Sequence, residues 1–263
     1  MACSVDEDVD SDAMAPTYEK TRWSVTINAV EKFLDEFLSE GTSNKVSVIS
    51  YCGSARTEIT RTSSKNDIMS KLNLIYDEEM YNNDYKSYYK RNDVTKIGRG
   101  LGSATNIQQG LKQVSEIAGD TTGASVILFT DGGANRYDNG EIGGYYYIKN
   151  NNEINRYNKP RDEVTQYCDI NGNISMDEEW NVNGSYYAGK AGEELKAAGA
   201  DIYTIVLMSK ESDITDLVKV SLGNKSLNYE KSWEKTYFTF SGGGYAKEFY
   251  TAANAEQLNN RFR

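Results

Sequence analysis

Residues 124–133 read Ala-Ser-Val-Ile-Leu-Phe-Thr-Asp-Gly-Gly, and they indicate the class of fold. The run from Val126 to Phe129 is apolar throughout, and turn-forming residues follow it closely. A short apolar run of this kind is typical of a strand that is buried on both faces, as in parallel sheets covered by helices. The strand is expected to end at Thr130, which leaves the Asp131 carboxylate at its carboxyl tip. In open α/β sheets, ligands bind beyond that edge.

Helical and strand patterns alternate along the chain on both sides of this strand. Apolar residues at three- and four-residue steps predict a helix over residues 23–38, and Asn106 is placed to cap another helix. Further strands are expected over residues 45–51, 55–62, 201–208 and 249–251, and further helices over 66–75, 187–198, 214–222 and 255–263. The alternation predicts an α/β fold, doubly wound, with a mostly parallel central sheet and helices on both faces.

Two stretches, residues 76–99 and 132–185, interrupt this alternation. They are rich in Tyr, Asn and Gly, and the second is too long for an ordinary connection. We therefore expect residues 1–263 to form a single domain with two insertions that project as arms. Aromatic rings suit recognition surfaces, so the arm residues expected to contact a ligand are Tyr88, Tyr89, Tyr145, Tyr146 and Tyr147. The alternatives are rings that pack the arms onto the sheet, or a bias in composition.

The composition excludes several classes of function. The 29 Lys and Arg against 39 Asp and Glu give a net charge of −10, which argues against binding to nucleic acid. No apolar run approaches the length of a membrane span, so we expect no membrane insertion by this chain. His is absent, which removes the usual general base and nucleophile partner, and an enzyme is not expected. A cation site built from oxygen ligands remains open.

The three cysteines are not spaced for a metal site. Cys3, Cys52 and Cys168 stand far apart with no C-x-x-C pair, so a zinc site is not expected. Three thiols, or one disulfide and one thiol, are both compatible with the sequence.

Two short motifs place oxygen-bearing side chains at the expected ligand edge. Ser103-Ala-Thr-Asn106 stands immediately before a predicted helix, and Thr130-Asp-Gly-Gly133 follows the apolar strand. In this order they resemble the von Willebrand factor A (integrin I-like) family. In that family, "TN" before a helix and "TDG" after a strand form two of the three loops of a metal-ion-dependent adhesion site (MIDAS). Other segments also resemble the family, and the resemblance extends from about residue 14 to the end.

The third loop departs from the family pattern. The family has a hydrophobic first strand that ends in Asp-x-Ser-x-Ser, often followed by Met, whereas this chain has Val5-Asp-Glu-Asp-Val-Asp-Ser-Asp-Ala-Met14. If Met14 is aligned with the Met of the family, Val9, Ser11 and Ala13 occupy the three motif positions, and none of them carries a carboxylate. A shift by one residue places Asp8, Asp10 and Asp12 there, and with Asp131 these would bring up to four negative charges to one ion.

The resemblance implies a divalent cation, Mg²⁺ or Ca²⁺ with Mn²⁺ as a further candidate. The metal ligands that it implies are Asp8, Asp10, Asp12, Thr105 and Asp131. Residues 8–12 are alternatively a solvated acidic arm. Thr105 and Asp131 are alternatively parts of a helix start and an Asp turn.

The resemblance also implies a function. Within the family, the chain is most similar to adhesion modules of bacterial surface or pilus-tip proteins. Such modules bind a protein or extracellular-matrix ligand through an acidic group of that ligand. Such a module is extracellular, so a secretion signal and an anchor are expected outside this chain. The alternatives are an intracellular scaffold for assembly, a structural spacer with a degenerate metal site, and a metal-dependent hydrolase without a recognisable nucleophile or base.

Overall fold

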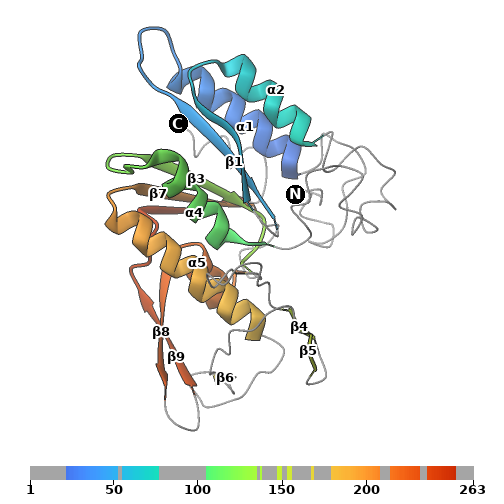
Figure 1. Cartoon of the computed structure of the whole chain (residues 1–263), viewed down its shortest axis with the longest axis vertical. Coiled ribbons are helices and arrows are strands. Elements are labelled where there is room, and N and C mark those ends of the chain that lie inside the picture. The colour runs from blue at the N-terminus through green and yellow to red at the C-terminus, as the bar shows by residue number, and fades with distance from the viewer. Residues whose placement is uncertain are drawn as a thin grey trace.

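A three-stranded parallel sheet forms the centre of the described molecule (Figure 1). The structure is a computed structural model, and it describes residues 22–52, 55–76, 105–134, 137, 147–149, 153–155, 167–168, 179–207, 214–231 and 236–252. The strands lie in the order β10-β7-β3, with bounds Glu248–Ala252, Asp201–Leu207 and Ser125–Thr130. Ser125 lies opposite Asp201, so β3 and β7 run side by side with their carboxyl ends at the same edge. The expected α/β fold with a parallel sheet is confirmed.

Helices cover both faces of this sheet. Ile202 and Val206 of β7 pack with residues of α4 (Ile107–Ala118) and α5 (Glu179–Ala197). Ile205 and Leu207, which point to the opposite side of the strand, pack with residues of α1 (Arg22–Phe37). A sheet that is apolar on both faces needs both layers, because each uncovered face would leave apolar surface in water.

A second, antiparallel sheet lies beside the first. It consists of β1 (Val46–Tyr51) and β2 (Ala55–Thr62), paired so that Tyr51 lies opposite Ala55. Helix α2 (Lys65–Tyr76) packs beside α1, and the buried side chains between them include Leu34 and Ile68. Among the described strands, β1 pairs only with β2, and β3 only with β7. The two sheets share α1, which contributes Val25 to one core cluster and Leu34 to another.

The C-terminal region contains a hairpin that the sequence analysis did not predict. Strands β8 (Lys225–Lys231) and β9 (Thr236–Gly242) are antiparallel and follow α6 (Asp216–Ser221). The signal was present, because Leu227 and Tyr229 alternate with polar residues, as expected for a half-exposed strand. Short strands β4 (Tyr147–Lys149) and β5 (Glu153–Asn155) pair with each other, and β6 (Tyr167–Cys168) pairs with β9.

The expected arms lie largely outside the described residues. Helix α5 begins at Glu179, within the range 132–185 that was expected to be an insertion. The expected helix over 255–263 is also outside the described part. The single-domain division and the boundaries of the arms remain predictions.

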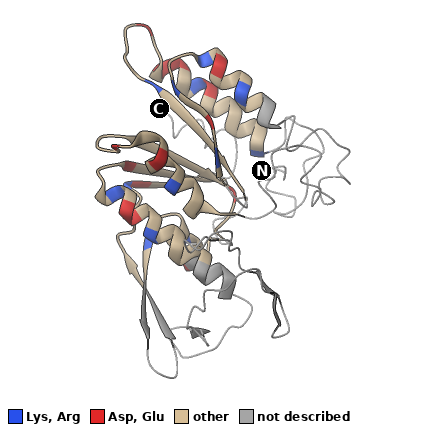
Figure 2. Ribbon diagram, viewed as in Figure 1, with Lys and Arg blue, Asp and Glu red and all other residues tan. Residues whose placement is uncertain are grey.

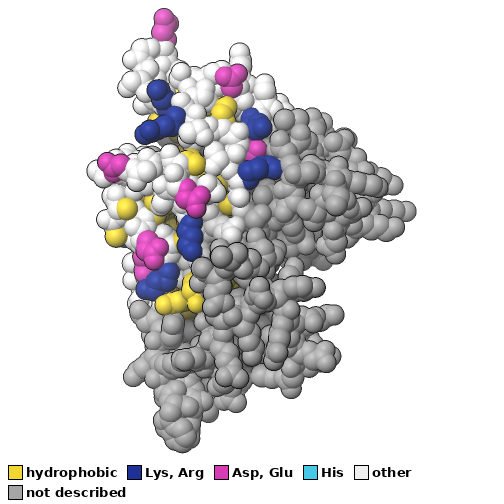
Figure 3. Space-filling view, in the orientation of Figure 1, with side chains coloured by type: hydrophobic (Ala, Val, Ile, Leu, Met, Phe, Trp, Pro, Cys, Tyr) yellow, Lys and Arg dark blue, Asp and Glu magenta, His cyan; other side chains and the backbone are white. Residues whose placement is uncertain are grey.

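Charges of both signs are interspersed on the helices. Both Lys or Arg and Asp or Glu side chains occur along α1 and α5 (Figure 2). On the face drawn in Figure 3, apolar side chains of the described residues form small, separate patches between charged ones. None of the described helices combines the length and the apolar character that crossing a membrane requires.

Candidate metal centre at the carboxyl edge of the sheet

Asp131 stands directly after β3, at the carboxyl edge of the parallel sheet. The preceding Thr130 is buried, and its hydroxyl donates to the Gly132 carbonyl at 2.7 Å and accepts from the Gly132 N–H at 3.2 Å. These two bonds hold the chain in a tight turn immediately after the strand. The Asp131 side chain is 25% exposed, so it remains reachable from solvent. The predicted position of this carboxylate, at the tip of the strand, is confirmed.

Thr105 precedes α4 at the same edge. The next residue, Asn106, is fully buried, and its side-chain oxygen accepts the Gln109 N–H at 3.1 Å, which confirms the predicted helix cap. The Asn106 N–H donates to the Cys52 carbonyl at 2.6 Å, so the start of α4 is tied to the end of β1. Thr105 is half-buried beside this junction.

Tyr51 connects the ends of β1 and β3. Its hydroxyl donates to the carbonyl oxygen of Phe129 at 2.7 Å. Burial raises the pKa of Tyr51 well above its ordinary value, and the negative charge of Asp131 acts in the same direction. The hydroxyl therefore stays protonated and can donate at any physiological pH. Together, the Tyr51 and Asn106 bonds gather the ends of β1 and β3 and the start of α4 at one edge.

Replacing Tyr51 with Phe is expected to lower the free energy of unfolding by about 1 kcal/mol, the usual net contribution of one hydrogen bond, because the part-buried bond to the Phe129 carbonyl is lost. The ring packing is retained, so the effect isolates the hydrogen bond to Phe129. Urea unfolding of the two proteins measures it. A change within 0.5 kcal/mol, the range typical of surface substitutions, would show that water replaces the hydroxyl there.

Arg22, the first residue of α1, lies against Asp131. Its Nη1 atom is 3.7 Å from the Asp131 Oδ2 atom, and its side chain is only 6% exposed. Burial acts to raise the pKa of Asp131, but nearby positive charge, that of Arg22 included, holds this pKa below its ordinary value. Asp131 is therefore ionised and accompanied by a positive side chain. Neither Arg22 nor Tyr51 could be assigned to this edge from the sequence, because neither belongs to a motif and both reach the edge through tertiary contacts.

The donors at this edge suit a hard cation only in part. Carboxylate and hydroxyl oxygens, as on Asp131 and Thr105, are the ligand types that Mg²⁺ and Ca²⁺ take in proteins. No cluster of three or more His, Cys, Asp or Glu side chains that could hold a metal occurs within the described ranges. The positive guanidinium of Arg22 would also repel a metal cation bound to Asp131.

Most of the remaining residues that were expected at the site lie outside the part of the chain that the structure describes. Asp8, Asp10 and Asp12 lie outside the described residues, as do Tyr88, Tyr89, Tyr145 and Tyr146. Tyr147 begins strand β4. Their expected roles remain predictions.

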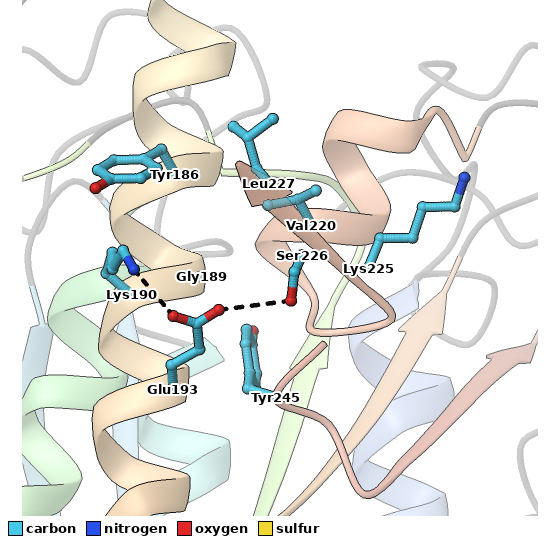
Figure 4. A pocket seen from close by; sticks show the side chains of 9 residues that line it. All are labelled: Tyr186, Gly189, Lys190, Glu193, Val220, Lys225, Ser226, Leu227 and Tyr245. Atoms are coloured by element: carbon cyan, nitrogen blue, oxygen red, sulfur yellow. Dashed lines mark hydrogen bonds and ion pairs between the residues drawn. The ribbon is translucent and has the colours of Figure 1, made fainter. Parts of the chain in front are cut away.

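A hollow lies between α5 and β8, away from this edge (Figure 4). Its polar groups already bind each other: Glu193 accepts from the Lys190 ammonium at 3.2 Å and from the Ser226 hydroxyl at 3.5 Å. The buried ring of Tyr245 forms part of its wall. Because Lys190, Glu193 and Ser226 already bind one another in this hollow, the carboxyl edge of the sheet is the stronger candidate site.

Residues 10–134 match the model of the von Willebrand factor type A domain family. This chain therefore resembles the von Willebrand factor type A domain family over just under half of its length. The match runs from the acidic segment through α1, β1, β2, α2 and α4 to the turn after β3, so it includes both Thr105 and Asp131. The von Willebrand factor type A resemblance noted from the sequence is confirmed. A comparison with curated proteins finds no significant match.

Solved structures share the fold. The PilB minor pilin from Streptococcus sanguinis is 15% identical, with a TM-score of 0.53 over 99% of this chain and 57% of the pilin. The D319A mutant of that pilin is 14% identical, with a TM-score of 0.53 over 98% of this chain and 57% of its own. The vWF domain of the type V pili tip protein Mfa5 from Porphyromonas gingivalis is 14% identical, with a TM-score of 0.49 over 92% and 87% of the two chains. The chain thus spans little more than half of the pilin that it resembles.

Proposed function

We propose that this chain is a von Willebrand factor type A domain and serves as a binding module of a bacterial cell-surface or pilus protein. It would recognise a protein or extracellular-matrix ligand through a divalent cation at the carboxyl edge of the sheet. The observation that carries the proposal is the convergence of Asp131 and the Thr105 segment at that edge, in the two family motifs that the sequence contains.

The chemistry of the edge supports cation-mediated recognition. Asp131 is ionised and partly exposed, so it can both bind a cation and leave part of the coordination shell open. A ligand carboxylate is a hard oxygen donor and could complete that shell. Mg²⁺ and Ca²⁺ are both candidates, and Mn²⁺ is a third. In the proposed function the protein binds and does not catalyse.

The likeness in fold to a minor pilin supports a place outside the cell. In this proposal, segments beyond the present chain would supply secretion and anchoring. The arms with their tyrosines would add contacts to the ligand around the cation.

One observation favours a second candidate, a structural domain that works without metal. The Arg22 guanidinium already supplies a positive charge to Asp131, so the edge can be electrostatically satisfied without an ion. Such a domain would act as a spacer in a larger assembly.

Thermal unfolding of the full chain in EDTA, Mg²⁺, Ca²⁺ and Mn²⁺ separates the two candidates. An ion at about one hundred times its Kd stabilises a protein by about 2.7 kcal/mol, which raises Tm by several degrees for a domain of this size. We expect such a rise for at least one ion, and we expect it to vanish in Asp131→Asn. The matched control is Asp35→Asn, which makes the same change on the exposed face of α1 and should keep the rise.

Two results would contradict the cation proposal. If no ion raises Tm in the wild type, the spacer function is favoured. If the rise persists in Asp131→Asn, the ion binds elsewhere. Binding of the full chain to immobilised collagen and fibronectin, in Mg²⁺ or Ca²⁺ and again in EDTA, then tests the ligand class.

A further inference from the structure

Arg22 is more deeply buried than any other positively charged side chain in the described ion pairs. Its side chain is 6% exposed, whereas the next most buried, those of Arg56 and Lys71, are 27% exposed. The other paired lysines lie at the surface, with exposures of 28% or more. Arg22 is thus held inside the fold, facing the candidate metal centre.

The position of Arg22 on its helix makes this burial costly. It is the first residue of α1, and the first turn of this helix has no acidic residue. The amino end of a helix carries partial positive charge, which disfavours a cation there. Taking a guanidinium out of water costs further free energy unless an anion accompanies it. The Asp131 carboxylate, 3.7 Å away, is such an anion.

We propose that Arg22 is a resident counter-ion of Asp131, and that a divalent cation must compete with it for this carboxylate. Arg22 therefore sets the cation affinity of the site. This inference rests on the proposed cation-binding function and identifies a residue that would tune it.

The physical basis is repulsion between like charges in a partly buried place. A divalent ion on Asp131 and the Arg22 guanidinium would share one carboxylate, where the effective dielectric constant is well below that of water. Either the guanidinium moves away when the ion binds, or the ion binds against its field. In both cases the wild-type protein binds the ion more weakly than a protein without this charge.

Titration calorimetry of the full chain with Mg²⁺ and with Ca²⁺ tests the competition. We expect Arg22→Gln to bind the ion at least tenfold more tightly than the wild type. Arg22→Met, which keeps an apolar stem of similar length but no charge, should show the same gain. Lys65→Gln is the matched control, because it removes one positive charge from an exposed ion pair on α2 and should leave the Kd unchanged.

A stability readout accompanies the calorimetry. Without an ion, Arg22→Gln should have a lower Tm than the wild type, because the positive charge 3.7 Å from the Asp131 carboxylate is lost. Saturating Mg²⁺ or Ca²⁺ should then raise Tm more in the variant than in the wild type. Circular dichroism establishes whether each variant is folded before titration, and Arg22→Met serves if the Gln variant is not.

The outcomes distinguish this inference from the proposed function. If the wild type and both variants bind the ion with Kd values within twofold of one another, the proposed competition by Arg22 is wrong, and the proposed cation-binding function is retained. If none of the three binds any ion, both ideas are wrong. If only the variants bind, Arg22 blocks the site completely, which supports the competition and favours the metal-free spacer for the wild type.

Discussion

Replacing Tyr245 with Ala is expected to lower the free energy of unfolding by about 3–5 kcal/mol, the range for losing a large buried aromatic side chain. Tyr245 is 1% exposed and belongs to the core cluster that joins α4, α5 and the parallel sheet. Its hydroxyl donates to the Ser221 carbonyl at 2.6 Å, which fixes the end of α6. The substitution therefore removes packing and leaves that carbonyl without its donor.

Urea unfolding of the wild type, Tyr245→Ala and Tyr245→Phe measures these contributions separately. The Phe variant loses only the hydroxyl and is expected to cost about 1–3 kcal/mol. A loss below 1 kcal/mol in the Ala variant would show that the surrounding core collapses into the space. That result would mean that the ring is not held as tightly as the structure shows.

Replacing Gly192 with Ala is expected to lower the free energy of unfolding by about 1–3 kcal/mol, the usual cost of overpacking a core. Gly192 lies in α5, and a Cβ atom there would overlap the ring of Tyr245. The ring is buried and held by its hydrogen bond to Ser221, so it has little freedom to move aside. The usual helix preference for Ala over Gly is outweighed at this position.

The same helix provides the matched control. A Cβ atom at Gly189 would lie 3.5 Å from the Val220 side chain, an ordinary packing distance. Gly189→Ala is therefore expected to be neutral or stabilising by up to about 1 kcal/mol, because Ala favours the helix. In the double variant Gly192→Ala/Tyr245→Ala, the costs should not add, since the ring that causes the clash is gone. Equal losses at Gly189 and Gly192 would contradict this explanation.

Most elements of the fold could be predicted from local patterns. The helix beginning near Trp23, the strand ending at Thr130 and the Asn106 cap all agree with the structure. Each rests on apolar periodicity or on a hydrogen bond to a neighbouring residue. The hairpin over residues 225–242 was missed because its first strand has only two apolar side chains, Leu227 and Tyr229, among polar ones, which is a short alternation.

The candidate site could be predicted only in part. Asp131 and Thr105 were identified because each stands beside an element whose end is visible in the sequence. Arg22 lies 109 residues from Asp131 along the chain, and Tyr51 bonds to a carbonyl 78 residues away. Nothing in the sequence near either residue indicates these contacts.

The amino-acid sequence alone therefore specified the buried strands, the helix that follows Asn106 and the oxygen-bearing side chain at the strand end. These depend on interactions between residues a few positions apart, and such interactions leave a periodic or capping pattern. Only the tertiary structure brought Arg22 against Asp131 and placed the Tyr245 ring against Gly192. Those contacts join elements that meet through burial of apolar surface, which is not directional, so their partners become known only once the helices are packed on the sheet.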